Sequence, residues 1–486
     1  MKIKIYNTLA RKKEVLHPLE EGHVKLYVCG ITSYDYCHIG HARSALVFDM
    51  VVRYLRYRGY RVTFVRNFTD IDDKIIARAA EQGVDAQELA QRFIDEFYVD
   101  MDALAVMRPD IEPRATDHIP EMIELVQELI DKGLAYPSGG DVYYRVNRFT
   151  GYGALSGRSL EDMQAGARIE VNDQKEHPMD FVLWKAAKPG EPKWQSPWGD
   201  GRPGWHIECS AMSRKYFGET FDIHGGGKDL IFPHHENEIA QSSGASGKTF
   251  ANLWMHHGFV TIKDEKMSKS LGNFLTIRDV LEQYPAEVLR LFIFSTQYRN
   301  PLDFTEDALQ DAQSGLDRMY DCLAGVERLS EEEGEAAAIS SKDRKKIASL
   351  RQRFESAMDN DFNTAQALGF IFDTVKVLNK LTRMLSQHAA AEDILLVRQG
   401  AADVRELAGV LGVLQQEPVQ YVARKKQQLL DSIDISEDKI LELIARRNAA
   451  RDEKDWAASD LVRDELLAHN VELHDGPEGT TWDVKS

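Results

Sequence analysis

The segment His38-Ile39-Gly40-His41 combines residues that suit phosphate binding, and it lies where a predicted strand gives way to a predicted helix. The first turn of a helix carries unpaired N–H groups and a partial positive charge, both of which favour an anion. Gly40 would let a ligand approach the backbone closely, and histidines three residues apart lie on one helical face. The segment therefore indicates a phosphate site, although two surface histidines that bind nothing would give the same spacing.

A second segment with phosphate chemistry is Lys266-Met267-Ser268-Lys269-Ser270, in a polar stretch between Asp264 and Gly272. Two lysines three residues apart around a serine can hold a polyphosphate as point charges. An ordinary solvated basic loop would have the same composition, so this segment alone does not decide the function.

A third set of residues offers sulfur, nitrogen and oxygen ligands. Cys29 ends a predicted strand, Cys209 lies in Gly204-Trp205-His206-Ile207-Glu208-Cys209, and His234 and Glu238 share one helical face. Thiolate, imidazole and carboxylate together suit zinc, but the spacing matches no zinc-finger pattern. Core cysteines beside a surface helix are the structural alternative. Three further histidines compete as ligands: His206, His224 and His235.

The elements that must position these residues begin with a strand at 26–29, a helix at about 41–60 and a second strand at 61–67. A strand, a helix and a strand of these lengths form a βαβ unit, which implies a parallel sheet with helices on its faces. Such sheets bind ligands at the carboxyl ends of their strands. We therefore expect the site to be built from residues 29–41 and 69–74.

Later segments predict a helix at 119–132 and sheet strands at 221–224 and 253–255. In the tail, Leu461 and Val462 are assigned to one buried helical face. The predicted fold class is α/β, with a Rossmann-type parallel-sheet catalytic domain that carries an insertion, then an α-helical bundle and a small α+β C-terminal module. The expected limits are a catalytic domain at 1–306 with an insertion at about 115–204 and a motif loop region at about 255–306, a bundle at 307–420, and the module at 421–486.

Composition places the chain among ordinary globular proteins. Its 486 residues are 43% hydrophobic and 28% charged, and the net charge of −18 argues against binding membrane or nucleic acid by bulk charge. Four cysteines are too few for a disulfide framework and favour a reducing compartment. No apolar run reaches the roughly 18 residues of a membrane span, and no signal peptide is recognisable. We expect a cytoplasmic protein that does not bind membranes.

Together, the first two segments resemble the paired signature motifs of class I aminoacyl-tRNA synthetases. Further segments are similar to the cysteinyl-tRNA synthetase family over essentially the whole chain. They are Cys29-Gly30, residues 67–74, 204–212, 221–227 and 232–238, and the ending Gly476-Pro477-Glu478-Gly479-Thr480-Thr481-Trp482. One departure is Gly30-Ile31-Thr32-Ser33, where the family usually has Gly-Pro-Thr-Val, so the proline that would fix φ in this turn is missing.

The resemblance implies a two-step reaction. ATP and L-cysteine give cysteinyl adenylate and pyrophosphate, and the cysteinyl group then moves to the terminal ribose of the cysteine tRNA. Catalysis of the first step is mostly positioning and charge stabilisation, with Mg²⁺ accompanying ATP. By resemblance, Lys269 makes the main phosphate contact and Lys266 assists, while His38 and His41 hold the adenosine and phosphates. Gly40 and Ser268 complete the expected ATP-binding set.

The resemblance also places one zinc ion on Cys29, Cys209, His234 and Glu238, with the substrate thiolate as an added ligand. An apolar pocket rejects a near-isostere by only about 10²-fold, and serine is nearly the size of cysteine. Zinc instead distinguishes a soft thiolate from a neutral hydroxyl, so no editing domain is needed. The amino acid pocket implied by the family is Thr69, Trp205, His224 and Asp229, with Asp229 suited to the substrate ammonium.

The tail is an exception to the usual charge of nucleic-acid-binding domains. Residues 421–486 hold 10 basic and 15 acidic side chains, a net charge of −5, whereas such domains are usually basic. An anticodon-binding role then depends on local clusters such as Arg424-Lys425-Lys426, Arg446-Arg447 and Arg451, with bases recognised by hydrogen bonds and stacking. Trp482 could stack on a base or anchor the module. The expected enzyme is a monomer.

Two other functions are compatible with parts of the sequence. A cysteine ligase that makes a small thiol metabolite would keep the zinc and ATP motifs but need no anticodon module, so the 66-residue tail argues against it. A degenerate paralogue acting as a binding protein would not need to keep Lys266, Lys269 and all four candidate metal ligands.

Overall fold

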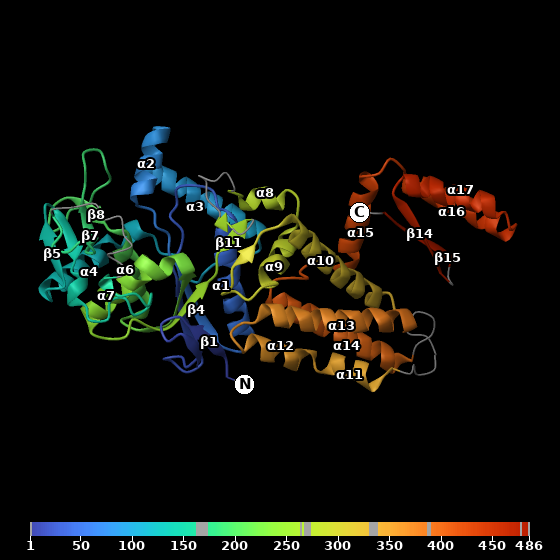
Figure 1. Cartoon of the computed structure of the whole chain (residues 1–486), viewed down its shortest axis with the longest axis horizontal. Coiled ribbons are helices and arrows are strands. Elements are labelled where there is room, and N and C mark those ends of the chain that lie inside the picture. The colour runs from blue at the N-terminus through green and yellow to red at the C-terminus, as the bar shows by residue number, and fades with distance from the viewer. Residues whose placement is uncertain are drawn as a thin grey trace. The chain divides into compact units, whose positions relative to one another are not determined.

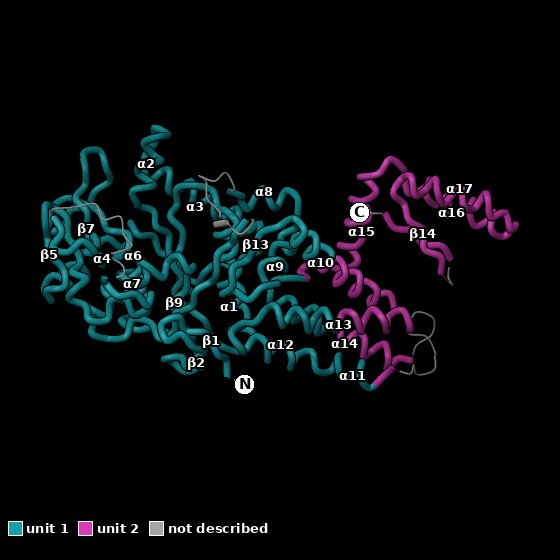
Figure 2. The backbone as a smooth tube through the Cα atoms, in the orientation of Figure 1, with its two compact units in different colours: residues 1–314, 341–374, 402–413 teal, residues 315–340, 375–401, 414–486 magenta. Residues whose placement is uncertain are grey.

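The computed structural model describes residues 2–161, 174–262, 265–266, 274–329, 339–385, 390–476 and 479–484. The chain forms two compact units, and Figure 2 colours residues 1–314, 341–374 and 402–413 as unit 1 and the remainder as unit 2. Three long helices each have residues in both units: α10 (Glu306–Glu327), α13 (Thr364–Leu385) and α14 (Ala391–Val410). The expected functional limits near residues 306 and 420 remain predictions.

The centre of unit 1 is a parallel sheet in the order β10-β9-β3-β4 (Figure 1). Its strands are β3 (His23–Val28), β4 (Arg61–Arg66), β9 (Phe221–Gly227) and β10 (Ala251–His257). Helix α1 (Ile39–Tyr57) connects β3 to β4, so the predicted βαβ unit is confirmed. Strand β3 is almost wholly buried, as expected for a parallel strand covered on both faces.

The segment between β4 and β9 contains helices and a second, antiparallel sheet in the order β5-β6-β7-β8. Helix α4 packs here because Met122, Leu125, Val126 and Leu129 form one buried stripe at helical spacing. The elements in chain order are α2 (Asp73–Gln82), α3 (Ala86–Ala103), η1 (Ala115–His118), α4 (Ile119–Asp131), β5 (Ala135–Ser138), β6 (Asp141–Tyr144), η2 (Val146–Arg148), β7 (Phe181–Ala186), β8 (Gly201–Pro203) and α6 (Trp205–Phe217).

Strand β9 leads into the turns η3 (Lys228–Leu230) and η4 (Ile231–His235) and then helix α7 (Glu236–Ser246). A small sheet, β12-β11-β13, follows β10. The elements after β10 are β11 (Val260–Ile262), β12 (Glu265–Lys266), α8 (Ile277–Leu281), α9 (Ala286–Phe294) and β13 (Leu302–Asp303).

The N-terminal hairpin of β1 (Lys4–Asn7) and β2 (Lys12–Val15) ties the start of the chain to a segment far along the sequence. The Lys4 amide donates to the Asp359 carbonyl, and the Asp361 amide donates to the Lys4 carbonyl, both at 2.8 Å. The Tyr6 amide also donates to the Asp361 carboxylate at 2.8 Å. Unit 1 is therefore closed by contacts between its first strand and residues after α12 (Leu350–Met358).

The predicted helical region is confirmed over its described residues, with α11 (Ser341–Ala348) and α12 lying between α10 and α13. Unit 2 ends in α15 (Pro418–Asp431), α16 (Glu437–Asp452), α17 (Trp456–Ala468) and a hairpin of β14 (Val471–Gly476) and β15 (Gly479–Val484). The predicted fold class is confirmed.

The assignment of Leu461 to the buried face of α17 is wrong, because its side chain is 69% exposed while Val462 and Leu466 are buried. Successive helical residues are turned by about 100°, which rotates Leu461 away from the stripe that Val462 and Leu466 share.

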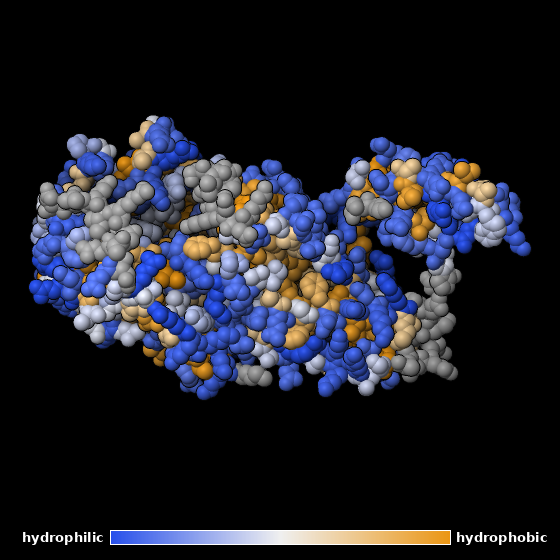
Figure 3. Space-filling model, in the orientation of Figure 1, coloured by the Kyte–Doolittle hydropathy of each residue, from blue (hydrophilic) through white to orange (hydrophobic). Residues whose placement is uncertain are grey.

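The molecular surface seen in Figure 3 consists mostly of hydrophilic residues. In the described part of the chain, no helix is both long and apolar enough to span a membrane.

Candidate active site

The His38 imidazole caps the N-terminus of helix α1. Its Nδ1 accepts a hydrogen bond from the Gly40 amide at 3.0 Å, and the His41 Nδ1 accepts one from the His38 amide at 3.2 Å. The two rings stack with centroids 3.8 Å apart. Amides that were expected to be unpaired are therefore already bonded to the two histidines.

These caps fix what the histidines can offer a ligand. Because each Nδ1 accepts a hydrogen bond, the network assigns the proton of each neutral ring to Nε2. Burial lowers the pKa of His41 well below its ordinary value, and the neighbouring His38 lowers it further. The pair is therefore suited to donating N–H groups to phosphate oxygens as neutral rings.

The position of the His38 ring requires that residue 40 have no side chain. A β-carbon at this position would lie 2.7 Å from Cε1 and 2.9 Å from Nδ1 of His38. The His38 ring also contacts Phe274, with the two centroids 5.3 Å apart in an edge-on arrangement. The capped conformation therefore depends on the missing side chain at residue 40.

A cavity of about 390 Å³ opens at the carboxyl ends of the central strands. Six of the expected site residues line it: Cys29, His38, Gly40, His41, Trp205 and Asp229. Lys74, from the expected segment 69–74, also lines the cavity, whereas His257 and Phe259 line it without having been expected from the sequence. His257 lies two residues beyond the predicted strand at 253–255, so the rule that ligands bind beyond strand ends could have identified it.

The loop that lacks the usual proline is held by its neighbours. The Ser33 amide donates to the Thr69 carbonyl at 3.1 Å, and the Thr69 amide donates to the Ile31 carbonyl at 3.0 Å. The Gly30 amide donates to the Asn67 side chain at 2.9 Å. These hydrogen bonds pin residues 30–33 to the segment after β4 and so perform the task that a fixed φ would perform.

The four expected metal ligands, Cys29, Cys209, His234 and Glu238, come together in one buried cluster. One potential ligand atom from each lies within 4.8 Å of the others. The two Sγ atoms are 3.5 Å apart, Cys29 Sγ is 3.4 Å from Glu238 Oε1, and His234 Nε2 is 3.0 Å from the same oxygen. Cys29 directly follows strand β3, Cys209 lies within helix α6, His234 lies in the η4 turn, and Glu238 lies in the first turn of helix α7.

The electrostatics of this cluster favour a cation at its centre. Burial and the adjacent Cys209 raise the pKa of Cys29 well above its ordinary value. Burial alone would lower the pKa of His234, but Glu238 and Cys209 raise it to about 10. Positive charge is thus attracted to the point where the four side chains meet. Two sulfurs, one imidazole and one carboxylate are a donor set that fits zinc, which would replace the protons.

A second set of potential ligands shares Cys29 and Glu238 with the first and adds His224 and His235. Here His235 Nδ1 lies 2.7 Å from His256 Nε2, and His224 Nε2 lies 2.8 Å from Glu238 Oε2. The first set has two thiols, whereas this one has a single thiol. Since thiolates are the stronger zinc ligands, the donor chemistry favours the first set.

The remaining expected pocket residues differ in their placement. Thr69 is buried and donates its hydroxyl to Glu208 Oε2 at 2.5 Å, and His224 is fully buried with its ring stacked on Trp254. Neither lines the cavity, whereas Trp205 and Asp229 do. Glu208 was not singled out from the sequence, and burial raises its pKa well above the ordinary value.

The second phosphate motif falls mostly outside the described residues. Ser268 and Lys269 are not described, and of Lys266 only the backbone is, which pairs with Thr261 in β11. The chain resumes beside the first motif. The Ile39 amide donates to the Leu275 carbonyl at 3.2 Å, and the Ile277 amide to the Cys37 carbonyl at 3.0 Å. The segment at 275–277, which follows the second motif, is therefore hydrogen-bonded to residues 37–39 at the start of the first motif.

Residues 15–314 match the family described as tRNA synthetases class I (C) catalytic domain, and residues 353–415 match the DALR domain. A cysteine–tRNA ligase of Desulfotalea psychrophila is 64% identical over 485 residues, which cover 100% of this chain and 99% of that protein. The chain belongs to the cysteine–tRNA ligase family. Another member, from Geobacter sp. strain M21, is 55% identical over 487 residues and the full length of both chains.

Among solved structures, a methionyl-tRNA synthetase of Mycobacterium tuberculosis in complex with methionyl-adenylate is similar in fold, with a TM-score of 0.62. The similarity covers 84% of this chain and 93% of that one at 18% sequence identity. This family member therefore has the architecture of a class I synthetase, as its parallel sheet and βαβ unit indicated.

Proposed function

We propose that this protein attaches L-cysteine to the cysteine tRNA through cysteinyl adenylate, using the cavity beyond β3 and β9. The observation that carries the proposal is the position of Cys29. It lines the cavity that also holds His38 and His41, and it belongs to the buried cluster with Cys209, His234 and Glu238. A thiol-selective site and a phosphate-binding helix terminus thus open into one cavity.

In the first step, ATP would bind with its phosphates at the start of helix α1. The Nε2–H groups of His38 and His41 would donate to phosphate oxygens, and Lys266, Ser268 and Lys269 would supply further contacts, with Mg²⁺ accompanying ATP. Donors placed in advance stabilise the charge that develops on the phosphates. Trp205 and Asp229 would hold the amino acid beside them, Asp229 through the substrate ammonium.

Selectivity for cysteine would come from the cluster rather than from pocket size. Zinc, when bound, would supply a soft Lewis acid that favours a thiolate over the hydroxyl of serine. Cys29, Cys209, His234 and Glu238 would hold one such ion. His206 Nδ1 lies 3.0 Å from His234 Nδ1 and would orient this imidazole.

The module at 421–486 would bind the anticodon. Trp482 packs against the module's own core, and Lys426 Nζ lies 4.4 Å from its ring centroid, which supports an anchoring role. Trp456, by contrast, is 60% exposed and offers an indole face to a base. Arg451 forms an ion pair with Asp475 of the same module, so it would contact RNA as part of an ion-pair network.

Pyrophosphate exchange measured with each amino acid in turn, followed by charging of purified tRNA, tests this proposal. Cysteine should support exchange and serine should not, and the cysteine tRNA should then be charged. Exchange with cysteine but no charging of any tRNA would refute the tRNA ligase function and leave only adenylate formation.

A further inference from the structure

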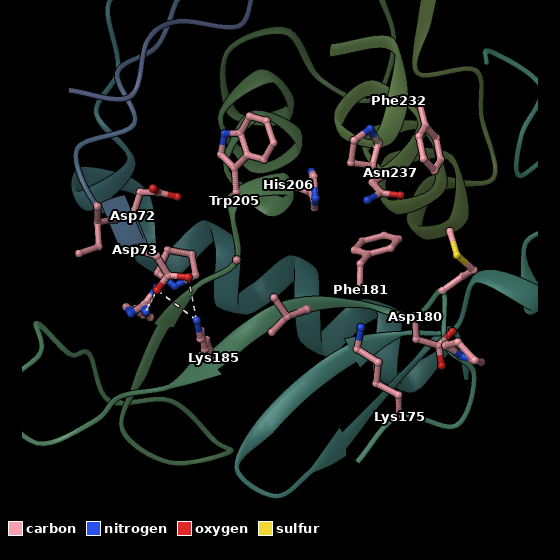
Figure 4. A pocket seen from close by; sticks show the side chains of 18 of the residues that line it. Asp72, Asp73, Lys175, Asp180, Phe181, Lys185, Trp205, His206, Phe232 and Asn237 are labelled. Atoms are coloured by element: carbon pink, nitrogen blue, oxygen red, sulfur yellow. Dashed lines mark hydrogen bonds and ion pairs between the residues drawn. The ribbon is translucent and has the colours of Figure 1, made fainter. Parts of the chain in front are cut away.

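The walls of the cavity beyond β3 and β9 are held in place by different kinds of contact. At Trp205 this cavity borders a second one, of about 540 Å³, where an ion pair between Asp73 and Lys185 at 2.8 Å ties the start of α2 to the antiparallel sheet (Figure 4). The wall at residues 257–260 is tied instead to helix α1, through the side chain of Arg43. The proposed reaction gives Arg43 no role.

Arg43 is a cation that is buried without a counter-charge. Its side chain is fully buried, and it forms no ion pair with a carboxylate in the part of the chain that the structure describes. Burial lowers its pKa to about 10, so the guanidinium stays charged at neutral pH. Arg290 is equally buried but has the Asp49 carboxylate at 2.8 Å. Because removing an unpaired charge from water is costly, the contacts that Arg43 makes must offset that cost.

The guanidinium of Arg43 joins helix α1 to two segments at once. Its Nη1 donates to the Phe259 carbonyl at 2.6 Å, and its Nη2 donates to the carbonyls of Tyr298, at 3.1 Å, and Asn300. Phe259 directly precedes β11, and Asn300 lies just before β13, the strand that pairs with β11 in parallel. The planar fork of an arginine suits acceptors on two separate segments.

The small sheet does not need Arg43 for its own pairing. The Phe259 carbonyl also accepts a hydrogen bond from the Leu302 amide at 2.9 Å, and the Tyr298 carbonyl accepts one from the Gly258 amide at 2.8 Å. Both carbonyls would therefore keep a partner if the guanidinium were removed. What would be lost is the bond between the small sheet and helix α1.

Helix α1 and the small sheet each lead to one of the two phosphate motifs. His38 and His41 lie at the start of α1, and Arg43 follows two residues after His41. Strand β11 pairs with β12, which ends at Lys266, the first residue of the second motif. The contacts of Arg43 therefore help to fix where the second motif begins relative to the two histidines.

We propose that Arg43 is a positioning residue for adenylate formation, which holds the strand leading into the second phosphate motif against the helix that carries the first. The inference rests on the proposed function, in which both motifs contact the phosphates of ATP. Arg43 does not itself line the cavity, and its three acceptors are main-chain carbonyls. It acts in the first step only, because pyrophosphate has left before the cysteinyl group moves to the tRNA.

The main test is Arg43→Met, which fills a similar volume and buries no charge. Its Tm should stay close to that of wild type, because the sheet keeps its own pairing. The kcat of cysteine-dependent pyrophosphate exchange should fall about 10- to 100-fold, since a displacement of about 1 Å can cost that much. The KM for cysteine and the single-turnover transfer from bound cysteinyl adenylate to tRNA should stay within about twofold of wild type.

Two lysine variants form a matched pair. Arg43→Lys keeps the charge but replaces the fork with one ammonium, so kcat for exchange should fall here too. Arg290→Lys alters an equally buried arginine that contacts neither the small sheet nor a phosphate motif, so it should leave kcat within about twofold of wild type. If Arg43→Met does not fold, Arg43→Lys decides the question alone.

Wild-type kcat in the folded Arg43 variants would overturn the proposal. Slowing of the transfer step as large as the slowing of adenylate formation would also overturn it, because a general structural defect affects both steps. An equal loss of kcat in Arg290→Lys would have the same meaning. Absence of cysteine-dependent exchange by the wild type would instead refute the proposed function.

Discussion

Replacing Gly40 with alanine should damage catalysis while leaving the stability of the fold nearly unchanged. The new β-carbon would lie 2.7 Å from Cε1 of His38, which is closer than carbon atoms approach without movement. The ring cannot tilt freely because His41 stacks on one side of it and Phe274 contacts it from another. His38 must therefore leave its capping position, and its hydrogen bond with the residue 40 amide is lost.

The two effects on stability oppose each other. Loss of an N-terminal cap costs about 1 kcal/mol, whereas a glycine-to-alanine change inside a helix stabilises by about the same amount. The net change in the free energy of unfolding should therefore lie within about 1 kcal/mol of zero. Catalysis has no such compensation, because a misplaced hydrogen-bond donor to the transition state costs about 10²- to 10³-fold in kcat.

The assay is cysteine-dependent pyrophosphate exchange, measured together with thermal unfolding. Gly369→Ala is a matched control, since Gly369 is also helical and a β-carbon there would meet no heavy atom within 4 Å. The control should keep full exchange and gain slight stability. Wild-type exchange by Gly40→Ala would refute the idea that the His38 position matters, and a large drop in Tm would show that the defect is one of folding.

The other predictions concern metal, phosphate, tRNA and pH. Purified protein should hold about one zinc per chain by metal analysis; Cys209→Ser should lose it and His235→Asn should retain it, and the reverse result would select the second ligand set. Lys269→Ala should cut adenylate formation far more than cysteine binding measured by calorimetry. Truncation before Tyr421 should preserve pyrophosphate exchange and strongly reduce tRNA charging, and equal charging would exclude an anticodon role for the tail. Burial lowers the pKa of His257 to about 4. Between pH 6.5 and 4 the unfolded chain therefore binds more protons than the folded protein. As the pH is lowered through that range, the free energy of unfolding should fall in wild type and should fall less in His257→Gln.

The sequence was informative where the signal is local. The strand at 61–67 and the helix at 119–132 agree with β4 and α4 to within a residue, because the apolar pattern that predicts each lies within the segment itself. The capping role of His38 could not be predicted, since histidine is not a usual N-cap residue and its ring is positioned by Phe274 far along the chain.

The candidate metal ligands illustrate the same limit. Cys29 and Cys209 are separated by 180 residues, and the spacing alone left His206, His224 and His235 open as competing ligands. Only the resemblance to a family selected four of these residues. The burial of Thr69 and His224 away from the cavity likewise depends on how α6, β9 and β10 pack, which no local pattern encodes.

The hydrogen bonds between Lys4 and the segment at Asp359 and Asp361 cannot form until that segment has been synthesised, which delays the completion of folding. Chains are synthesised at about 5–20 residues per second, so roughly 20 to 70 s separate the emergence of the first strand from that of its partner. During that interval β1 pairs with the short strand β2, and the end of β1 can bond to β10 once residues 252–254 have been synthesised. Unit 1 also includes residues 402–413, so in a nascent chain it can be complete only after residue 413 has been synthesised.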